Sequence, residues 1–210
     1  MPTPSKPIIL SVEAPLDEAV KIFKNGGVVA YPTETFYGLG VDPFNEKAVE
    51  RLFSLKGREK GKPVALLIKD RAMLGSVAAS IPPIAERLIK KYWPGPLTII
   101  FKACARIPSS VTGGTNTIGV RVSSSAVAGR LMNALSSPLT ATSANPSGKA
   151  PPAAARQVVD YFNGNIDLLI DGGTLPGSLG STVVDVTGNE PRILREGEVP
   201  AVEILRSVKD

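Results

Sequence analysis

The sequence predicts a layered α/β domain built on a mixed β-sheet. Helix-like and strand-like segments alternate along the whole 210-residue chain, which is typical of helices packed on a sheet. The last strand-like segments follow one another as in hairpins, so we expect antiparallel as well as parallel pairs. The composition, 43% hydrophobic and 20% charged, is that of a globular protein with one sizeable core. Since no repeat or linker is evident, residues 1–210 read as one domain.

Local signals justify the elements in order. Residues 16–25 carry apolar side chains at helical spacing and precede two glycines, and residues 28–32 then read as a strand. Asn45 suits the N-cap of a helix that stops near Gly57, and residues 63–69 read as a buried strand. The further expected helices are residues 83–92, 124–135, 152–162 and 201–208, and the further strands are residues 97–103, 117–122, 138–142, 166–171, 182–186 and 192–194.

The residue types that are missing exclude several kinds of catalysis. The chain has no histidine, and Cys104 is its only cysteine. A Ser-His-Asp triad, a Cys-His pair, the usual zinc sites and a disulfide within the chain are therefore excluded. Catalysis would have to rely on substrate positioning, cationic side chains, backbone dipoles or a magnesium ion that enters with phosphates.

Targeting signals are not evident either. The N-terminus lacks the basic and apolar regions of a signal peptide, and no uninterrupted apolar run approaches the roughly 18 residues of a membrane span. We therefore expect a cytoplasmic protein that makes no contact with a membrane.

The segment YPTETFYGLG, residues 31–40, continues the strand-like run that starts at Val28. We interpret it as a loop after a strand, where short polar side chains sit beside backbone that glycine opens to a ligand. It would then form one wall of a site. The alternative is an ordinary turn.

Positive charge is concentrated in one part of the chain. Residues 51–71 contain seven basic and two acidic side chains, a surplus that equals the net charge of +5. A solvated surface and a phosphate or RNA site both fit this pattern. A P-loop is excluded, because the glycine spacing is wrong and Pro63 follows Lys62. In extended chain, Lys56 and Arg58 would share a face and could reach one polyphosphate.

Three later features add polar groups to the predicted sheet. Ser143, Asn145 and Ser147 follow a strand in a turn-like segment, and a glycine-rich stretch leads to Ser181. The simpler interpretation of the segment with Ser143, Asn145 and Ser147 is an ordinary turn. The simpler interpretation of the glycine-rich stretch is a flexible connection. Arg121 lies inside an apolar strand and needs a partner, which could be a buried carboxylate or the carboxylate or phosphate of a ligand.

Taken together, these segments resemble a known family. The chain contains, in this order, YPTETFYGLG, LKGREKGKPVALLI, WPGPLT, GVRV, TATSANPSG, GSTVVDV and ILREG. Their order and approximate spacing resemble those of the YrdC family of threonylcarbamoyl-AMP synthases, over nearly the whole chain. The resemblance implies a twisted mixed sheet, flanked by helices, around a large basic concave site. It also implies synthesis of threonylcarbamoyl-AMP and pyrophosphate from L-threonine, bicarbonate and ATP, for a partner complex that modifies an adenosine of tRNA.

The resemblance also implies roles for individual residues. Lys56 and Arg58 would be the catalytic residues. Threonine would contact Thr35, Arg121, Ala141 and Ser181, with its carboxylate on Arg121. ATP would contact Lys56, Arg58, Lys62, Thr117, Ser143, Asn145, Pro151 and Arg195. Mg²⁺ would accompany ATP, with no metal held tightly by the protein itself.

Two other functions remain open at this point. A basic concavity could simply hold structured RNA, in which case Thr35, Ser143 and Asn145 would only be turn residues. A YrdC-type paralogue without efficient synthase activity is the nearer alternative. The chain looks like the single-domain form of the family, which leaves open how a labile acyl-adenylate is shielded from water and whether tRNA contacts this chain.

Overall fold

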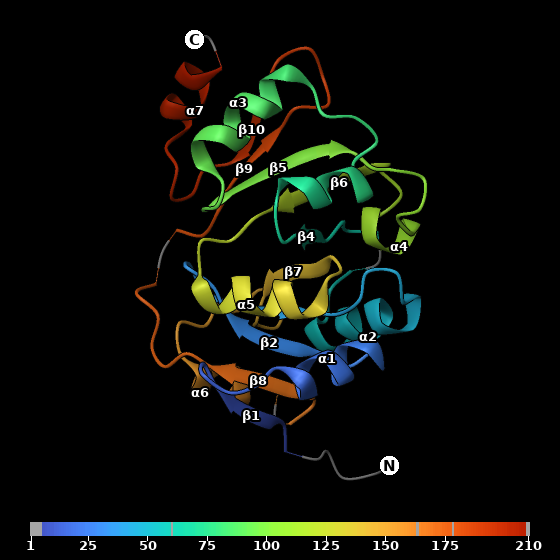
Figure 1. The fold of residues 1–210 in the computed structure, drawn as a ribbon, viewed down its shortest axis with the longest axis vertical. Helices are drawn as coiled ribbons and strands as arrows, with labels where there is room; N and C mark the ends of the chain where they lie inside the picture. The colour runs from blue at the N-terminus through green and yellow to red at the C-terminus, as the bar shows by residue number, and fades with distance from the viewer. Residues whose placement is uncertain (1–5, 60, 163, 178, 209–210) are drawn as a thin grey trace.

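The computed structural model describes residues 6–208 except residues 60, 163 and 178. A twisted mixed sheet of ten strands runs through the molecule in the order β1-β8-β2-β3-β7-β4-β6-β5-β9-β10, and Figure 1 shows β1 near one end and β10 near the other. The predicted fold class is confirmed. The strands are β1 Ile8–Ser11, β2 Val29–Pro32, β3 Tyr37–Gly40, β4 Ala65–Leu67, β5 Leu97–Lys102, β6 Thr117–Arg121, β7 Leu139–Ser143, β8 Leu168–Asp171, β9 Thr182–Asp185 and β10 Arg192–Arg195.

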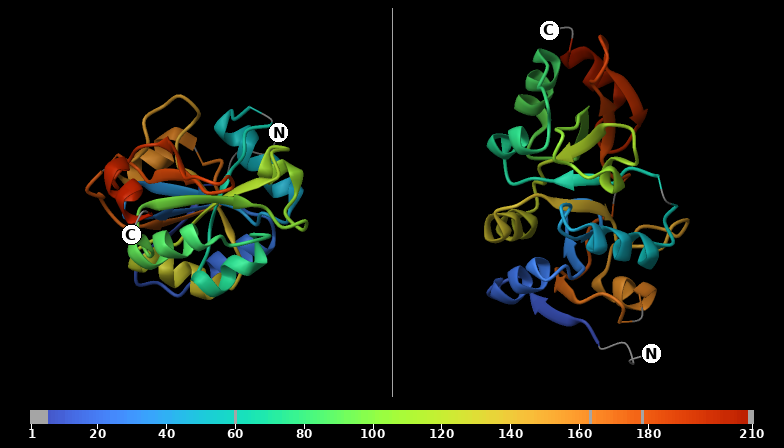
Figure 2. Two further views of the ribbon diagram at one scale, coloured as in Figure 1. Left: turned by 90° about the horizontal axis from the view of Figure 1, so that it is seen from above. Right: turned by 90° about the vertical axis from the view of Figure 1, so that its right-hand side faces the viewer.

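Helices cover both faces of this sheet. Figure 2 shows α1, α3 and α5 along one side, and α2 and α6 along the other. Ala19 and Phe23 of α1 and Leu131 of α5 are buried together against β2 and β8, because their apolar side chains recur at helical spacing. The helices are α1 Asp17–Lys24, α2 Glu46–Lys56, α3 Pro83–Tyr92, α4 Ser109–Thr112, α5 Ala126–Leu135, α6 Ala155–Phe162 and α7 Ala201–Ser207, with a 3₁₀ helix η1 at Arg71–Ser76.

The interpretation of residues 31–40 as a loop is wrong in its second half. Strands β2 and β3 form an antiparallel hairpin in which Tyr31 pairs with Gly38, and only residues 33–36 form the turn. A Cβ at Gly38 would lie 2.9 Å from the Tyr31 ring, so glycine is required where the two strands meet. A four-residue strand with two glycines gives little sequence signal.

Other departures are small. The sequence reasoning missed β1, an edge strand that pairs in parallel with β8, and the short helices η1 and α4. The expected antiparallel pair near the C-terminus is confirmed in β9 and β10, but antiparallel pairs also occur at β3–β7, β4–β7 and β5–β6. Among the described residues, no helix has both the length and the apolar character needed to cross a bilayer.

Candidate active site

A cavity of about 430 Å³ opens on the sheet beside the β2–β3 turn. Its floor is made of small residues on four neighbouring strands, Gly38, Ala65, Gly119 and Ala141. Because side chains alternate across a strand, the residues two positions away face the same cavity, and these include Arg121 beyond Gly119 and Ser143 beyond Ala141. The missing side-chain volume on this face of the sheet is therefore what creates the space for a ligand. We call this space the first cavity.

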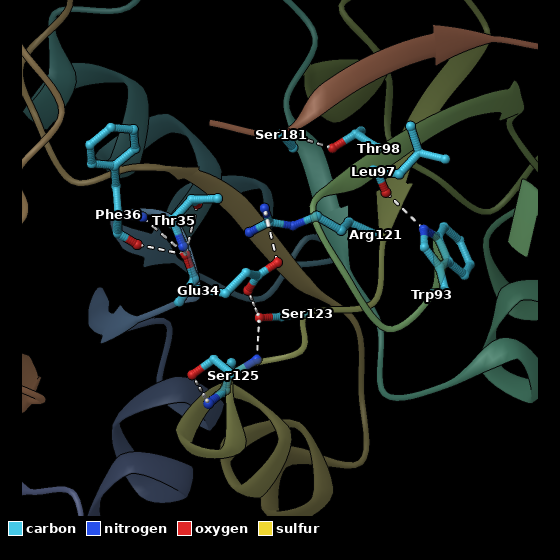
Figure 3. A network of polar contacts seen from close by, with 12 residues as sticks. Glu34, Thr35, Phe36, Trp93, Leu97, Thr98, Arg121, Ser123, Ser125 and Ser181 are labelled. Carbon is cyan, nitrogen blue, oxygen red and sulfur yellow. Dashed lines mark hydrogen bonds and ion pairs between the residues drawn. The ribbon is translucent and has the colours of Figure 1, made fainter. Parts of the chain in front are cut away.

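Arg121 is held at the wall of the first cavity by an acidic partner. Arg121 is only 9% exposed, and its Nη1 lies 3.6 Å from Glu34 Oε1. The Ser123 hydroxyl donates to Glu34 Oε2 and also accepts from the Ser125 backbone N–H. Figure 3 shows Glu34 between Arg121 and Ser123. The partly buried Glu34 is thus the carboxylate partner that the sequence reasoning left open, and Arg121 still lines the cavity.

Thr35 stands in the turn between β2 and β3, where Thr33 organises the backbone. Thr33 Oγ1 accepts from the backbone N–H groups of Thr35 and Phe36 and donates to the Phe36 carbonyl at 2.7 Å. Its hydroxyl also lies 3.0 Å from Thr35 Oγ1. The Thr35 side chain is therefore fixed by its own turn and lines the first cavity.

Ser181 and Arg195 form another part of the wall. The Arg195 guanidinium donates to the Ser181 carbonyl at 2.7 Å and to Ser181 Oγ at 3.0 Å. Burial and the neighbouring Arg121 both lower the pKa of Arg195. Two guanidinium groups on the wall of one cavity are suited to an anionic ligand.

A second cavity of about 300 Å³ is also bordered by Ser143. Lys56 lines it and is only 3% exposed. Its Nζ donates to the Ser143 carbonyl and, at 2.6 Å, to the Asn145 carbonyl. Burial, and secondarily the charge of Arg58, lower the pKa of Lys56 to about 8. Lys56 therefore fixes the segment that carries Ser143 and Asn145, with one of its three protons left for a ligand.

The extended geometry expected for Lys56 and Arg58 is wrong. Lys56 ends α2, Gly57 caps the helix in the left-handed conformation with φ 59°, and the Arg58 N–H returns to the Phe53 carbonyl at 2.9 Å. Only glycine adopts this conformation readily. Both cations nevertheless line the second cavity, since the cap turns the chain there. Arg58 donates to the Pro63 carbonyl at 2.6 Å and stacks over the Phe53 ring.

Asn145 leaves one oxygen without a partner. Its Nδ2 donates to the carbonyls of Pro146 and Lys149 at 2.9 and 2.7 Å, which fixes the orientation of the amide. Oδ1 is buried and has no hydrogen-bond partner in the described part of the chain. A buried acceptor of this kind can pair with a water, or with a donor or a cation of a ligand. Lys62 also lines this cavity, but it is exposed and paired with Glu59 at 2.9 Å.

The structure brings nearly all the predicted site residues together. The first cavity is lined by Thr35, Arg58, Arg121, Ala141, Ser143, Pro151, Ser181 and Arg195. The second cavity is lined by Lys56, Arg58, Lys62, Ser143 and Asn145. Arg58, Thr142 and Ser143 border both, so the two spaces adjoin. Thr117 lines neither cavity, although it shares a strand face with Gly119 and Arg121.

Three functional candidates were missed by the sequence reasoning. Glu34 partners Arg121, Thr98 contacts Ser181, and Tyr37 ties β3 to the segment after β8 by donating to the Gly173 carbonyl at 2.8 Å. The first and third lie inside YPTETFYGLG and the second ends WPGPLT. The segments were recognised, but periodicity alone could not assign their side chains to partners far away in sequence.

Comparisons with known proteins show which family this chain belongs to. The family model Sua5_yciO_yrdC, described as telomere recombination, matches residues 21–197. This chain belongs to the Sua5/YciO/YrdC family. The threonylcarbamoyl-AMP synthase of Pyrococcus abyssi is 39% identical over 206 residues, which are 96% of this chain and 61% of that protein. The threonylcarbamoyl-AMP synthase of Halorhodospira halophila is 42% identical over 149 residues, 71% of this chain and 78% of that protein.

Solved structures of the family have the same fold. P. abyssi Sua5 complexed with L-threonine superposes with a TM-score of 0.90 at 39% identity, covering 95% of this chain and 60% of that one. E. coli YciO superposes with a TM-score of 0.84 at 30% identity, covering 96% of this chain and 99% of that one. This chain thus spans about three fifths of the length of the P. abyssi protein and nearly all of YciO.

Proposed function

We propose that this chain makes threonylcarbamoyl-AMP and pyrophosphate from L-threonine, bicarbonate and ATP. The observation that carries the proposal is the pair of adjoining cavities, one bordered by Arg121, Thr35 and Ser181 and the other by Lys56 and Lys62. The first fits an amino acid, whose carboxylate suits the planar fork of Arg121. The second fits phosphates, which pair with cationic side chains.

The reaction proceeds in two bond-forming steps that need no protein nucleophile. The threonine amine, having lost a proton, adds to the carbon that bicarbonate supplies, and water leaves to give a carbamate. A carbamate oxygen then attacks the α-phosphorus of ATP, and the bond to pyrophosphate breaks. The chain's tasks are alignment and neutralisation of charge, which suits a protein without histidine.

Each side chain acts at a definite place in these steps. Arg121, braced by Glu34, holds the threonine carboxylate, and Arg58 and Ser143 border both cavities, where the carbamate and the α-phosphate meet. Lys56 and Arg58 meet the charge that grows on departing pyrophosphate, and Lys62 contacts the phosphates of ATP from the exposed rim. Arg195, which lies on the wall of the first cavity with Ser181, would reach the nucleotide from there.

Mg²⁺ would accompany ATP and neutralise phosphate charge. Within the described residues, no group of three or more histidine, cysteine, aspartate or glutamate side chains could hold a metal ion, so the phosphates would provide most of its ligands. Asn145 Oδ1, the buried acceptor of the second cavity, is a neutral oxygen of the type that Mg²⁺ accepts.

The product would serve tRNA modification, through a threonylcarbamoyl transferase complex that accepts it. Since ATP and tRNA are present in the cytoplasm, we place the protein there. We further propose that the exposed side chain of Lys62 contacts tRNA. A pure RNA-binding module is the weaker proposal, because Lys56 and Arg121 are buried and directed at the cavities, whereas RNA-binding cations are exposed.

Pyrophosphate release tests the proposal. The full chain is incubated with ATP, L-threonine and bicarbonate together, and with each omitted singly. Release that needs all three supports the synthase. Release that is absent with all three, or that persists without threonine, would refute it. The same assay can be run on Lys56→Ala. Lys47→Ala, which removes an exposed lysine from the same helix, is then the control for the loss of one positive charge.

A further inference from the structure

Thr98 is a buried polar residue to which the reaction above gives no role. It belongs to β5, is 6% exposed, and lines the first cavity. Its Oγ1 lies 2.9 Å from Ser181 Oγ, and a dashed line in Figure 3 marks this hydrogen bond. Among the described residues, the Thr98 hydroxyl has this one hydrogen-bond partner. A buried hydroxyl on the wall of a substrate cavity calls for an explanation.

The orientation of Thr98 is fixed by its surroundings. Its methyl group faces Gly119, where an added Cβ would lie 3.2 Å from Thr98 Cγ2. The Trp93 indole donates to the Leu97 carbonyl at 2.7 Å and anchors the start of β5. Because methyl and hydroxyl share one β-carbon, packing of the methyl group on Gly119 also directs the hydroxyl. That direction is toward Ser181.

The hydrogen-bonding protons around Ser181 can be counted. Arg195 can only donate, so Ser181 Oγ accepts from it at 3.0 Å. The hydroxyls of Thr98 and Ser181 have two protons, and the hydrogen bond between them uses one. The other proton has no acceptor among the described residues. It is therefore available to an atom in the cavity, and this wall is a hydrogen-bond donor.

Thr35 has the opposite character. The Thr33 hydroxyl gives its single proton to the Phe36 carbonyl at 2.7 Å, so the 3.0 Å contact between Thr33 and Thr35 must use the proton of Thr35. The Thr35 oxygen then presents lone pairs to the cavity that it lines. This wall is a hydrogen-bond acceptor. A hydroxyl group, which both donates and accepts, is complementary to the two walls together.

We propose that Thr98 is a positioning residue that sets Ser181 as a hydrogen-bond donor to the substrate hydroxyl, and so makes the cavity selective for a β-hydroxy amino acid. The inference rests on the proposed function, since it concerns the same amino-acid cavity. Thr98 acts through Ser181, while Thr35 accepts from the same substrate hydroxyl. Valine, which replaces that hydroxyl with a methyl group, would leave both walls unpaired.

The test compares two substitutions of Thr98 in the full chain. Thr98→Val keeps the shape and the methyl group and removes the hydroxyl, whereas Thr98→Ser keeps the hydroxyl. Thr112→Val removes a buried hydroxyl from α4, outside both cavities, and controls for that change alone. The measurement is the dissociation constant for L-threonine and for L-valine by calorimetry, without ATP, with the Tm of each variant as a check of folding.

We expect the parent protein to prefer threonine over valine by about tenfold or more, and Thr98→Val to lose about tenfold of that preference. Thr98→Ser keeps the hydroxyl but not the methyl group that packs on Gly119, so it should lose less of the preference than Thr98→Val, and Thr112→Val should retain it. No preference in the parent protein, an undiminished preference in Thr98→Val, or equal losses in both Thr98 variants would overturn the inference. Selective threonine binding without pyrophosphate release would instead refute the proposed synthase and leave this inference standing.

Discussion

The two adjoining cavities are organised by different kinds of contact. In the first cavity, Arg121 and Ser181 are each held by another side chain, Glu34 and Thr98 respectively, and Arg195 donates to both the Oγ and the carbonyl of Ser181. In the second cavity, side chains hold backbone: Lys56 donates to the Ser143 and Asn145 carbonyls, and Arg58 to the Pro63 carbonyl. Conservative changes in the first cavity should therefore alter the recognition of one substrate. Changes in the second cavity should alter both the positive charge of the cavity and the course of the backbone that its side chains hold.

The largest loss of pyrophosphate release is expected when Lys56 is replaced. Lys56→Ala removes a charge from the second cavity and frees the segment of Ser143 and Asn145 that it fixes. We expect pyrophosphate release to fall about a hundredfold or more, the scale of one lost preorganised contact. Hydrogen exchange at residues 143–149 should become faster in the same variant, while Lys47→Ala changes neither quantity.

Arg58→Ala should approach the same loss of activity, about a hundredfold, with faster exchange around residues 58–63. RNA affinity of the same variant, measured at several salt concentrations, distinguishes the synthase from an RNA-binding module. Near-normal pyrophosphate release in both variants, with a weaker RNA affinity and a salt dependence lower by about one counterion, would favour the binding module over the synthase.

The pH dependence of kcat/KM for ATP should report the titration of the Lys56 amine. Its pKa is lowered to about 8, so the free protein carries the ammonium below this pH and the neutral amine above it. The value of kcat/KM for ATP, which reports the free enzyme, should fall by up to about tenfold per pH unit above pH 8. Bound phosphate favours the ammonium, so the limb in kcat should lie at higher pH.

Lys56→Arg is the matched control for this profile, because a guanidinium does not titrate in the accessible range. Whatever its residual activity, the alkaline limb near pH 8 should be missing. An unchanged limb in Lys56→Arg would assign the titration to another group.

A smaller and more selective effect is expected in the first cavity. Arg121→Lys keeps the charge but loses the two-pronged contact with a carboxylate. We expect the KM for threonine to rise by about tenfold, as for one lost charged hydrogen bond, with the KM for ATP within about twofold. Equal losses for threonine and ATP in steady-state kinetics would contradict the separation of the two cavities.

The smallest effect belongs to Lys62, whose Nζ is exposed and paired with Glu59. Lys62→Ala should raise the KM for ATP by only about two- to threefold, and less at high salt, since exposed charges are screened. A loss as large as that of Lys56→Ala that persists at 0.5 M salt would contradict this minor, screened role of Lys62.

The sequence was sufficient for the fold class and for most of the long elements. Buried strands such as β5 are nearly continuous apolar runs, and amphipathic helices such as α2 have apolar residues at helical spacing. By contrast, β3 has two glycines because strands approach closely there, and β1 is a four-residue edge strand. In both, the strand exists because of its tertiary partner rather than its own propensity.

The site was predictable to a different degree. The need for a partner at Arg121 follows from one buried charge in an apolar strand, but Glu34 lies in another element and could not be assigned from spacing. The shared cavity of Lys56 and Arg58 was expected for the wrong reason, because the left-handed cap at Gly57 replaces extended chain. The directions of the hydroxyl groups of Thr98 and Thr35 required distances between atoms.

The central claim is that an amino acid in the first cavity is joined, through a bicarbonate-derived carbon, to the α-phosphate of a nucleotide at the border with the second. The most direct measurement gives the full chain L-[³H]threonine, [¹⁴C]bicarbonate and [α-³²P]ATP, and separates the products. We predict one product that carries all three labels in equal amounts and forms together with one equivalent of pyrophosphate. A threonine- and phosphorus-labelled product without ¹⁴C, or no product that unites threonine with the α-phosphate, would contradict the account.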